Sequence, residues 1–186
     1  MPRLIPYVMD IARVMYFIDG ENLAIRFGAT LKETGRVPAP QVVYTPNVLV
    51  WSPLLNEDGH GVIRKYYYTS VIESGPDIAE AERSLKAAGV EAPRVFRKDR
   101  AKGSKRVDIS LSTDMLLHAT RKHCDIAILV AGDEDYVPLV RAVQAEGVRV
   151  HVWFVPNGLS PALQQASDSY TDITHILAVE RQEPAV

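Results

Sequence analysis

Two stretches of sequence decide the fold: VMYFIDGEN at residues 14–22 and IAILVAGDED at residues 126–135. In each, a continuous apolar run is followed at once by a turn that contains glycine and acidic residues. Strands buried on both faces of a sheet have such continuous apolar runs, whereas strands with one solvated face alternate. The two stretches therefore predict neighbouring strands of a parallel sheet, each followed by acidic side chains at its carboxyl end.

Strands and helices alternate through the rest of the chain. Further strands are expected at residues 62–69, 94–96 and 148–155, and helices at residues 22–32, 77–88, 107–122, 136–146 and 161–166. This alternation predicts a three-layer α/β/α fold around a central, mainly parallel sheet of about five strands. Residues 1–186 are expected to form a single domain, with its core at about residues 14–176.

Residues 35–61 interrupt this pattern. They contain Pro38, Pro40, Pro46 and Pro53. Because proline cannot donate to a strand ladder, we expect a long irregular excursion with one short edge strand at residues 48–51. Excursions of this length inside compact domains are often functional. The apolar segment 48–55 is also a candidate contact in a homodimer.

Composition sets the broad class. The chain has 186 residues, a formal net charge of −2, 47% apolar residues and one cysteine, Cys124. These values are typical of a folded globular domain, and a single cysteine excludes an internal disulfide framework and a multi-cysteine zinc site. The longest apolar run, residues 126–131, is far shorter than the roughly 20 residues that span a bilayer. We therefore expect a soluble cytoplasmic protein with no membrane partner.

Acidic residues gather where the sheet is expected to bind ligands. Asp19 follows one apolar run, Asp133 and Asp135 follow the other, and Asp108 begins a helix that leaves the same sheet. Carboxylates packed this closely repel each other, and a divalent cation relieves that repulsion. Oxygen ligands without histidine or cysteine suit Mg²⁺ or Mn²⁺, which commonly act on phosphates.

A structural interpretation of the same residues stays open. Aspartate is a common turn and N-cap residue, and each of these positions precedes a helix; Asp135 in particular is a good N-cap. Asn22 would likewise cap a helix, or its amide would orient a bound water or a phosphate oxygen. Asp114 lies six residues after Asp108, about 240° further round an ideal helix, so it joins the acids only if Asp108 precedes the first helical turn. Otherwise we expect Asp114 to bond a neighbouring loop.

Three motifs taken together resemble the NYN domain family, in its LabA-like branch: FIDGEN (residues 17–22), KRVDISLSTDML (residues 105–116) and ILVAGDEDYVPLV (residues 128–140). The resemblance runs from about residue 14 to about residue 176. It implies membership of the PIN-like nuclease superfamily, a Rossmann-like (PIN-like) fold and a metal-dependent ribonuclease activity. It also implies these roles: Asp19, Asp108 and Asp133 as principal metal-site acids, Asp135 as a fourth, and Asn22 and Asp114 as supporting residues.

One position departs from the family pattern. The glycine-aspartate motif of the family usually begins with serine, whereas this chain has Ala131. If that hydroxyl positions water or substrate, its absence lowers activity.

A basic segment precedes Asp108. Residues 97–106 carry six basic residues and one acidic residue, a local net charge of +5. Such runs are often solvated loops, but a cationic segment beside an acidic site also suits the flanking phosphates of RNA. The candidate RNA-binding residues are Arg97, Lys98, Arg100, Lys102, Lys105 and Arg106.

Three functions follow from the sequence. The first is a Mg²⁺- or Mn²⁺-dependent ribonuclease with Asp19, Asp108, Asp133 and Asp135 as its catalytic residues. The second is a non-catalytic module of the same fold that binds RNA or a protein, which the substitution at Ala131 favours. The third is a phosphatase or nucleotidase using the same acids; its haloacid-dehalogenase form is opposed by Glu21, which stands where that motif needs a second aspartate.

Overall fold

The computed structural model of the chain describes residues 11–55, 61–72, 77–98 and 105–181. Within these ranges the centre of the molecule is a parallel sheet of six strands in the order β6-β5-β1-β7-β8-β9. The strands are β1 (Arg13–Asp19), β5 (Gly61–Val71), β6 (Ala92–Arg97), β7 (Ile126–Val130), β8 (Arg149–Phe154) and β9 (Ser169–Asp172).

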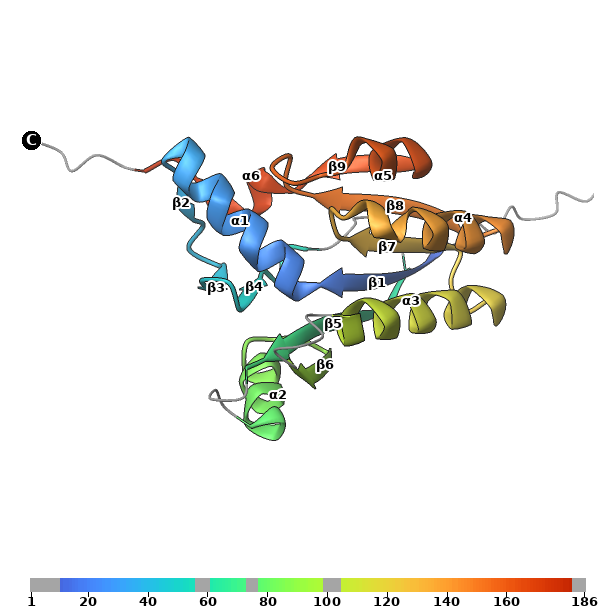
Figure 1. Cartoon of the computed structure of the whole chain (residues 1–186), viewed down its shortest axis with the longest axis horizontal. Helices are drawn as coiled ribbons and strands as arrows, with labels where there is room; N and C mark the ends of the chain where they lie inside the picture. Colours follow the sequence, from blue (N-terminus) through green and yellow to red (C-terminus); the bar gives the residue numbers. More distant parts are fainter. Residues whose placement is uncertain (1–10, 56–60, 73–76, 99–104, 182–186) are drawn as a thin grey trace, which may run out of the picture.

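Helices cover both faces of this sheet (Figure 1). They are α1 (Gly20–Thr34), α2 (Ile78–Ala87), α3 (Lys105–Thr120), the 3-10 helix η1 (Glu134–Tyr136), α4 (Val137–Ala145), α5 (Pro161–Ala166) and α6 (Thr174–Leu177). The predicted three-layer α/β/α fold is therefore confirmed. It has one strand more than the five expected.

Side chains of β1 alternate between two separate cores, as the geometry of a strand requires. Val14, Tyr16 and Ile18 pack into the core that α1, α2 and α6 cover. Met15 and Phe17 pack into the core that α3, α4 and α5 cover. The strand that opens the sequence pattern is thus buried on both faces, which explains its continuous apolar composition.

The order of the strands fixes where a ligand is expected. After β1 the chain builds β5 and β6 on one side, and α3 then carries it back to place β7 on the other side of β1. In open parallel sheets of this kind, ligands bind outside the carboxyl ends of the strands, where the strand order reverses. That point lies between the carboxyl ends of β1 and β7, where Ile18 pairs with Val130.

Strand β9 is the strand that sequence analysis missed. It reads SYTD, with half-buried and exposed positions, and it pairs with β8 at the edge of the sheet. An edge strand buries little apolar surface, so no hydrophobic run marks it in the sequence.

The proline-rich excursion is more ordered than expected. It contains β2 (Val37–Pro38), β3 (Val43–Thr45) and β4 (Leu49–Trp51). The short strand expected at residues 48–51 is β4, which pairs with β3 as an antiparallel hairpin outside the main sheet. Strand β2 pairs with β10 (Ala178–Val179). Val50 is fully buried, and its backbone N–H and carbonyl both bond the buried hydroxyl of Tyr67 on β5, which holds the hairpin against the sheet.

No helix in the described ranges is both long enough and apolar enough to cross a membrane.

Gly132 lies two residues after the end of β7 and permits close packing at the point where the strand order reverses. A Cβ atom there would lie 2.3 Å from Cε1 of Phe154 and 2.5 Å from the carbonyl oxygen of Gly158. We expect Gly132→Ala to lower the free energy of unfolding by about 1–3 kcal/mol, because a backbone oxygen cannot move aside as a flexible side chain can. Denaturant titration measures the change. Gly61→Ala is the control, since its Cβ would meet nothing closer than 3.4 Å, and equal losses in both variants would contradict the packing argument.

Candidate active site

Asp19 lies at the centre of the candidate site. It is the last residue of β1, only 4% of it is exposed, and it is the N-cap of α1. Its Oδ1 accepts a hydrogen bond of 3.0 Å from the backbone N–H of Asn22. Its Oδ2 accepts a hydrogen bond of 2.9 Å from the hydroxyl of Tyr136. Both carboxylate oxygens are therefore held in fixed directions.

The hydroxyl of Tyr136 joins Asp19 to a second acid. It lies 3.3 Å from Oδ1 of Asp108, which is in the first turn of α3. Tyr136 itself is buried at the end of η1. Three elements that are distant in the sequence, β1, α3 and η1, thus place the carboxylates of Asp19 and Asp108 in contact with the hydroxyl of Tyr136.

Burial dominates the electrostatics of this group. It raises the pKa of Asp19 to about 7; the hydrogen bonds from Asn22 and Tyr136 lower that pKa, and the nearby charge of Asp108 raises it. Burial likewise raises the pKa of Asp108, with further increases from Asp133 and other nearby acids. The pKa of Tyr136 lies far above its ordinary value because of burial and the two carboxylates, so its hydroxyl stays protonated and able to donate.

The donor set suits a hard cation. Among the described residues, none of the carboxylates of Asp19, Asp108, Asp133 and Asp135 forms an ion pair with a lysine, arginine or histidine. Buried carboxylates without a counter-charge are costly, and a divalent cation with oxygen ligands compensates them. Within the described part of the chain, no group of three or more Asp, Glu, His or Cys side chains is close enough to hold an ion. Mg²⁺ commonly binds through only one or two carboxylates, with waters and substrate phosphates as its other ligands.

Asp133 and Asp135 follow β7 and are exposed. Asp133 is the N-cap of η1, and its Oδ1 accepts a hydrogen bond of 3.2 Å from the backbone N–H of Asp135. The expectation that Asp135 caps the following helix is wrong, because Tyr136 occupies the N-cap position of α4. Asp133 and Asp135 both raise the pKa of Asp108, so they lie within electrostatic reach of it.

Asn22 and Asp114 have different surroundings. Asp19, rather than Asn22, caps α1; the Oδ1 of Asn22 instead accepts a hydrogen bond of 3.1 Å from the backbone N–H of Gly132. Asn22 therefore ties the start of α1 to the loop after β7. Asp114 lies in α3 together with Asp108, and it accepts a hydrogen bond of 2.9 Å from the hydroxyl of Tyr68 on β5. Its bonding partner is thus a strand, where a loop was expected.

The predicted RNA-binding residues divide into three groups. Arg97 ends β6, and Lys98 follows it with its ammonium group paired to Glu21. Arg106 is exposed in the first turn of α3. Arg100 and Lys102 lie outside the described residues, and for Lys105 only the backbone position at the start of α3 is described.

Two residues of the site were not found from the sequence. Tyr136 was taken only as the start of a helix, although it stands three residues after Asp133 at the expected ligand edge. Glu21 was considered only as the wrong residue for a phosphatase motif. Its carboxylate accepts a hydrogen bond of 2.5 Å from the hydroxyl of Ser70, and it also binds Lys98. Both contacts join residues far apart in the sequence, so no local pattern marks them.

Comparisons with known proteins agree with this fold. Residues 13–175 match the family model described as the NYN domain. Among curated proteins, no significant match is found. The structure is similar to the crystal structure of a protein of unknown function, VPA0982, from Vibrio parahaemolyticus RIMD 2210633, with a TM-score of 0.60 and 21% identity over 92% of this chain and 99% of the other. At that identity the likeness shows the fold alone, and the LabA-like branch stays a prediction.

The raised pKa of Asp19 has a consequence for stability. Without a cation, the folded protein keeps the proton of Asp19 up to about pH 7, whereas an unfolded aspartate loses it near the ordinary value of 3.8. The free energy of unfolding should therefore fall as the pH rises from about 4 to 7. We expect Asp19→Asn, which cannot ionise, to be more stable than the wild type at pH 8 by about 1–3 kcal/mol.

Denaturant titrations in EDTA at pH 5 and pH 8 measure this difference. The advantage of the variant should shrink at pH 5, where the wild-type carboxyl is protonated in the folded state. Asp77→Asn is the control, because Asp77 is an exposed N-cap of α2 and asparagine caps equally well. If the free energy of unfolding of Asp19→Asn varied with pH in the same way as that of the wild type does, the pKa of Asp19 would not be raised by burial.

Proposed function

The chain belongs to the NYN domain family, and we propose that it is a metal-dependent ribonuclease that hydrolyses RNA phosphodiester bonds at the carboxyl edge of its sheet. The family is nuclease-like in general. The observation that carries the proposal is the pair formed by the buried Asp19 and the half-buried Asp108, which contact one tyrosine hydroxyl at the point where the strand order reverses.

The proposed cofactor is Mg²⁺ or Mn²⁺, held by Asp19 and Asp108 with Asp133 and Asp135 as nearby acids. When bound, such an ion polarises a phosphoryl oxygen, lowers the pKa of a coordinated water and neutralises developing negative charge. Because the described carboxylates lack counter-charges of their own, they supply the negative charge that such an ion requires.

The other residues of the site position these acids. The hydroxyl of Tyr136 fixes one oxygen of Asp19 and contacts Asp108, so it limits rotation of both carboxylates. Asn22 fixes the other oxygen of Asp19 through its backbone N–H and holds the loop after β7 through its side chain. Together they keep the carboxyl ends of β1 and β7 in register before any ligand arrives.

The proposed contacts to RNA lie beside the acids. Arg97 ends β6, Lys98 follows it, and Arg106 is in the turn of α3 that also carries Asp108. Their charges would hold phosphates that flank the scissile one, with Arg100, Lys102 and Lys105 of the same basic segment. Such contacts position the backbone of RNA without reading its sequence.

A second candidate function is a non-catalytic module that binds RNA or a protein. Its support is Ala131, which stands where the resemblance expects serine. Ala131 is fully buried in the core on the α3 side of the sheet. In this arrangement its side chain is enclosed by core residues, so its methyl group offers no contact to a substrate.

The ribonuclease proposal predicts metal-dependent cleavage that requires the acid pair. Wild-type protein should cleave RNA with Mn²⁺ and stop in EDTA, and Asp108→Asn should reduce the rate by at least about a hundredfold, because a lost carboxylate weakens both metal binding and charge stabilisation. Gel analysis of labelled single- and double-stranded RNAs measures this. Circular dichroism checks that the variant is folded.

Asp77→Asn is the matched control, an identical change at an exposed helix cap. It should cleave RNA at the wild-type rate. A folded wild-type protein that cleaves none of a diverse set of RNAs with Mn²⁺ would favour the non-catalytic module. Faster hydrolysis of a phosphomonoester than of RNA would favour a phosphatase.

A further inference from the structure

A cavity of about 600 Å³ opens at the carboxyl ends of β5 and β6, next to the start of α1. Segments distant in the sequence line it: α1, the turn between β3 and β4, the end of β5 and the residue after β6. Glu21, which follows Asp19 by two residues, is one of its lining residues. The cavity and the acid pair therefore share one edge of the sheet and one helix N-terminus.

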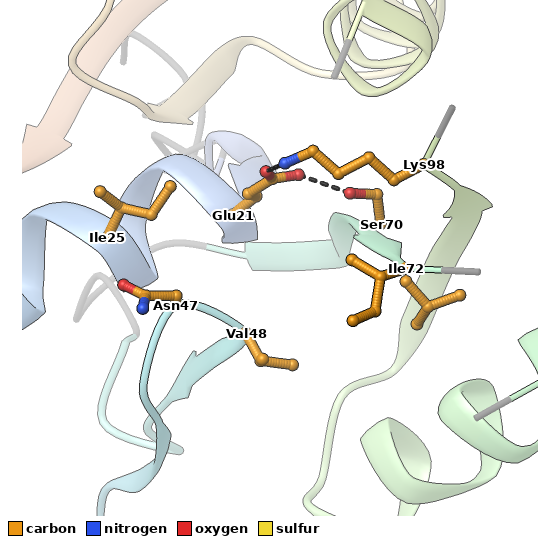
Figure 2. Close-up of a pocket in the computed structure, with 8 residues that line it drawn as sticks. Glu21, Ile25, Asn47, Val48, Ser70, Ile72 and Lys98 are labelled. Atoms are coloured by element: carbon orange, nitrogen blue, oxygen red, sulfur yellow. Dashed lines mark hydrogen bonds and ion pairs between the residues drawn. The ribbon is translucent and has the colours of Figure 1, made fainter. Parts of the chain in front are cut away.

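The cavity has apolar walls that are open to solvent. Ile25, Val48 and Ile72 line it, and they are 43%, 48% and 59% exposed. Figure 2 shows the three side chains arranged around one space, with Ile25 coming from α1 and Val48 from the hairpin turn. Large aliphatic side chains left exposed around a concave space indicate a surface that another molecule covers.

One side of the cavity is polar and fixed. The carboxylate of Glu21 is almost fully buried, and it binds the hydroxyl of Ser70 at 2.5 Å and the ammonium of Lys98 (Figure 2). This group presents a carboxylate acceptor and an ammonium donor side by side. Because each partner holds the others, their directions are set before a ligand binds.

We propose that this cavity binds the base of an RNA nucleotide next to the scissile phosphate, with its faces against the aliphatic walls and its polar edge against Glu21 and Lys98. The inference rests on the proposed function and deepens it by assigning a subsite for the substrate. Every nucleobase has apolar faces and an edge that carries both donors and acceptors, which matches an acceptor and a donor placed together. The volume is also within the range of small-molecule sites, about 300–1,000 Å³.

The charge around the cavity favours a nucleotide over an apolar peptide. Lys98, which lines the cavity, and Arg97 are the first residues of the basic segment 97–106, whose net charge is +5. Lysine and arginine side chains bind phosphates, so a ligand that carries a phosphate suits this side of the cavity. The acid pair lies beyond the start of α1. A base seated here would leave its phosphate near Lys98 and the acid pair, whereas an apolar peptide carries no phosphate for these charged groups.

The experiment measures binding of adenosine, guanosine, cytidine and uridine in EDTA, by NMR titration. Nucleosides carry no phosphate, so their binding isolates the base subsite from the metal and from the basic segment. We expect at least one nucleoside to bind saturably. Ile72→Glu should weaken that binding by at least about tenfold, because it places a charge against the face of the base.

Ile63→Glu is the matched control. Ile63 is 47% exposed near the other end of β5, so the same change there should leave nucleoside binding unchanged. Val48→Glu, on the opposite wall, is a second variant expected to act as Ile72→Glu does. Binding of none of the four nucleosides, or equal weakening by Ile63→Glu and Ile72→Glu, would overturn the proposal.

The two proposals fail separately. If wild-type protein binds a nucleoside at this cavity but cleaves no RNA with Mn²⁺, the ribonuclease proposal fails and the base subsite stands. If the protein cleaves RNA while neither Ile72→Glu nor Val48→Glu changes nucleoside binding, the base subsite fails alone.

Discussion

The carboxylate of Asp19, which is buried and forms no ion pair with any described residue, is the constraint on which the structure depends. Its position at the end of β1, beside the reversal of strand order, places it where helix N-termini and strand ends meet. An isolated buried charge is unfavourable unless it is protonated, hydrogen-bonded or bound to a cation. The protein uses the first two remedies itself, through a raised pKa and the bonds from Asn22 and Tyr136. The third, a bound cation, is the role that the proposed function assigns to a ligand.

Close packing at two glycines keeps this position in place. A Cβ on Gly20 would lie 2.1 Å from the ring of Tyr67, and one on Gly132 would meet Phe154 at 2.3 Å. Gly20 follows β1 and Gly132 follows β7, and at each position the missing side chain lets the backbone lie close to an aromatic ring. The hydroxyl of Tyr67 also bonds Val50 in the hairpin. The hairpin that forms one wall of the cavity is therefore anchored to the strand next to β1.

Sequence patterns predicted the parts of this fold that are governed by local burial. The runs at 14–18 and 126–130 gave both central strands, and glycine and acidic residues after them marked the ligand edge. They did not predict β9, because it is an edge strand whose side chains are half-buried or exposed. They also did not predict β3, the hairpin partner of β4, because a strand of three residues is too short to show a hydrophobic periodicity. The partners of Tyr136 and Glu21 were also beyond reach, since they lie 28 to 117 residues away in the chain.

Helix α1 connects the two halves of the site. Its N-cap Asp19 belongs to the acid pair, whereas Glu21 and Ile25, which are four residues apart and so on one helix face, line the cavity. A net charge of −2 for the whole chain conceals this division, because acids follow the central strands and six basic residues fall in the sequence segment 97–106, just before Asp108. A ligand that touched both halves would meet carboxylates on one side of the helix start and aliphatic walls on the other. In the proposed complex a single nucleotide would supply both groups, a phosphate for the cation and a base for the aliphatic walls. Because α1 carries both the Asp19 cap and the face with Glu21 and Ile25, one helix would link the proposed cleavage site to the proposed base subsite.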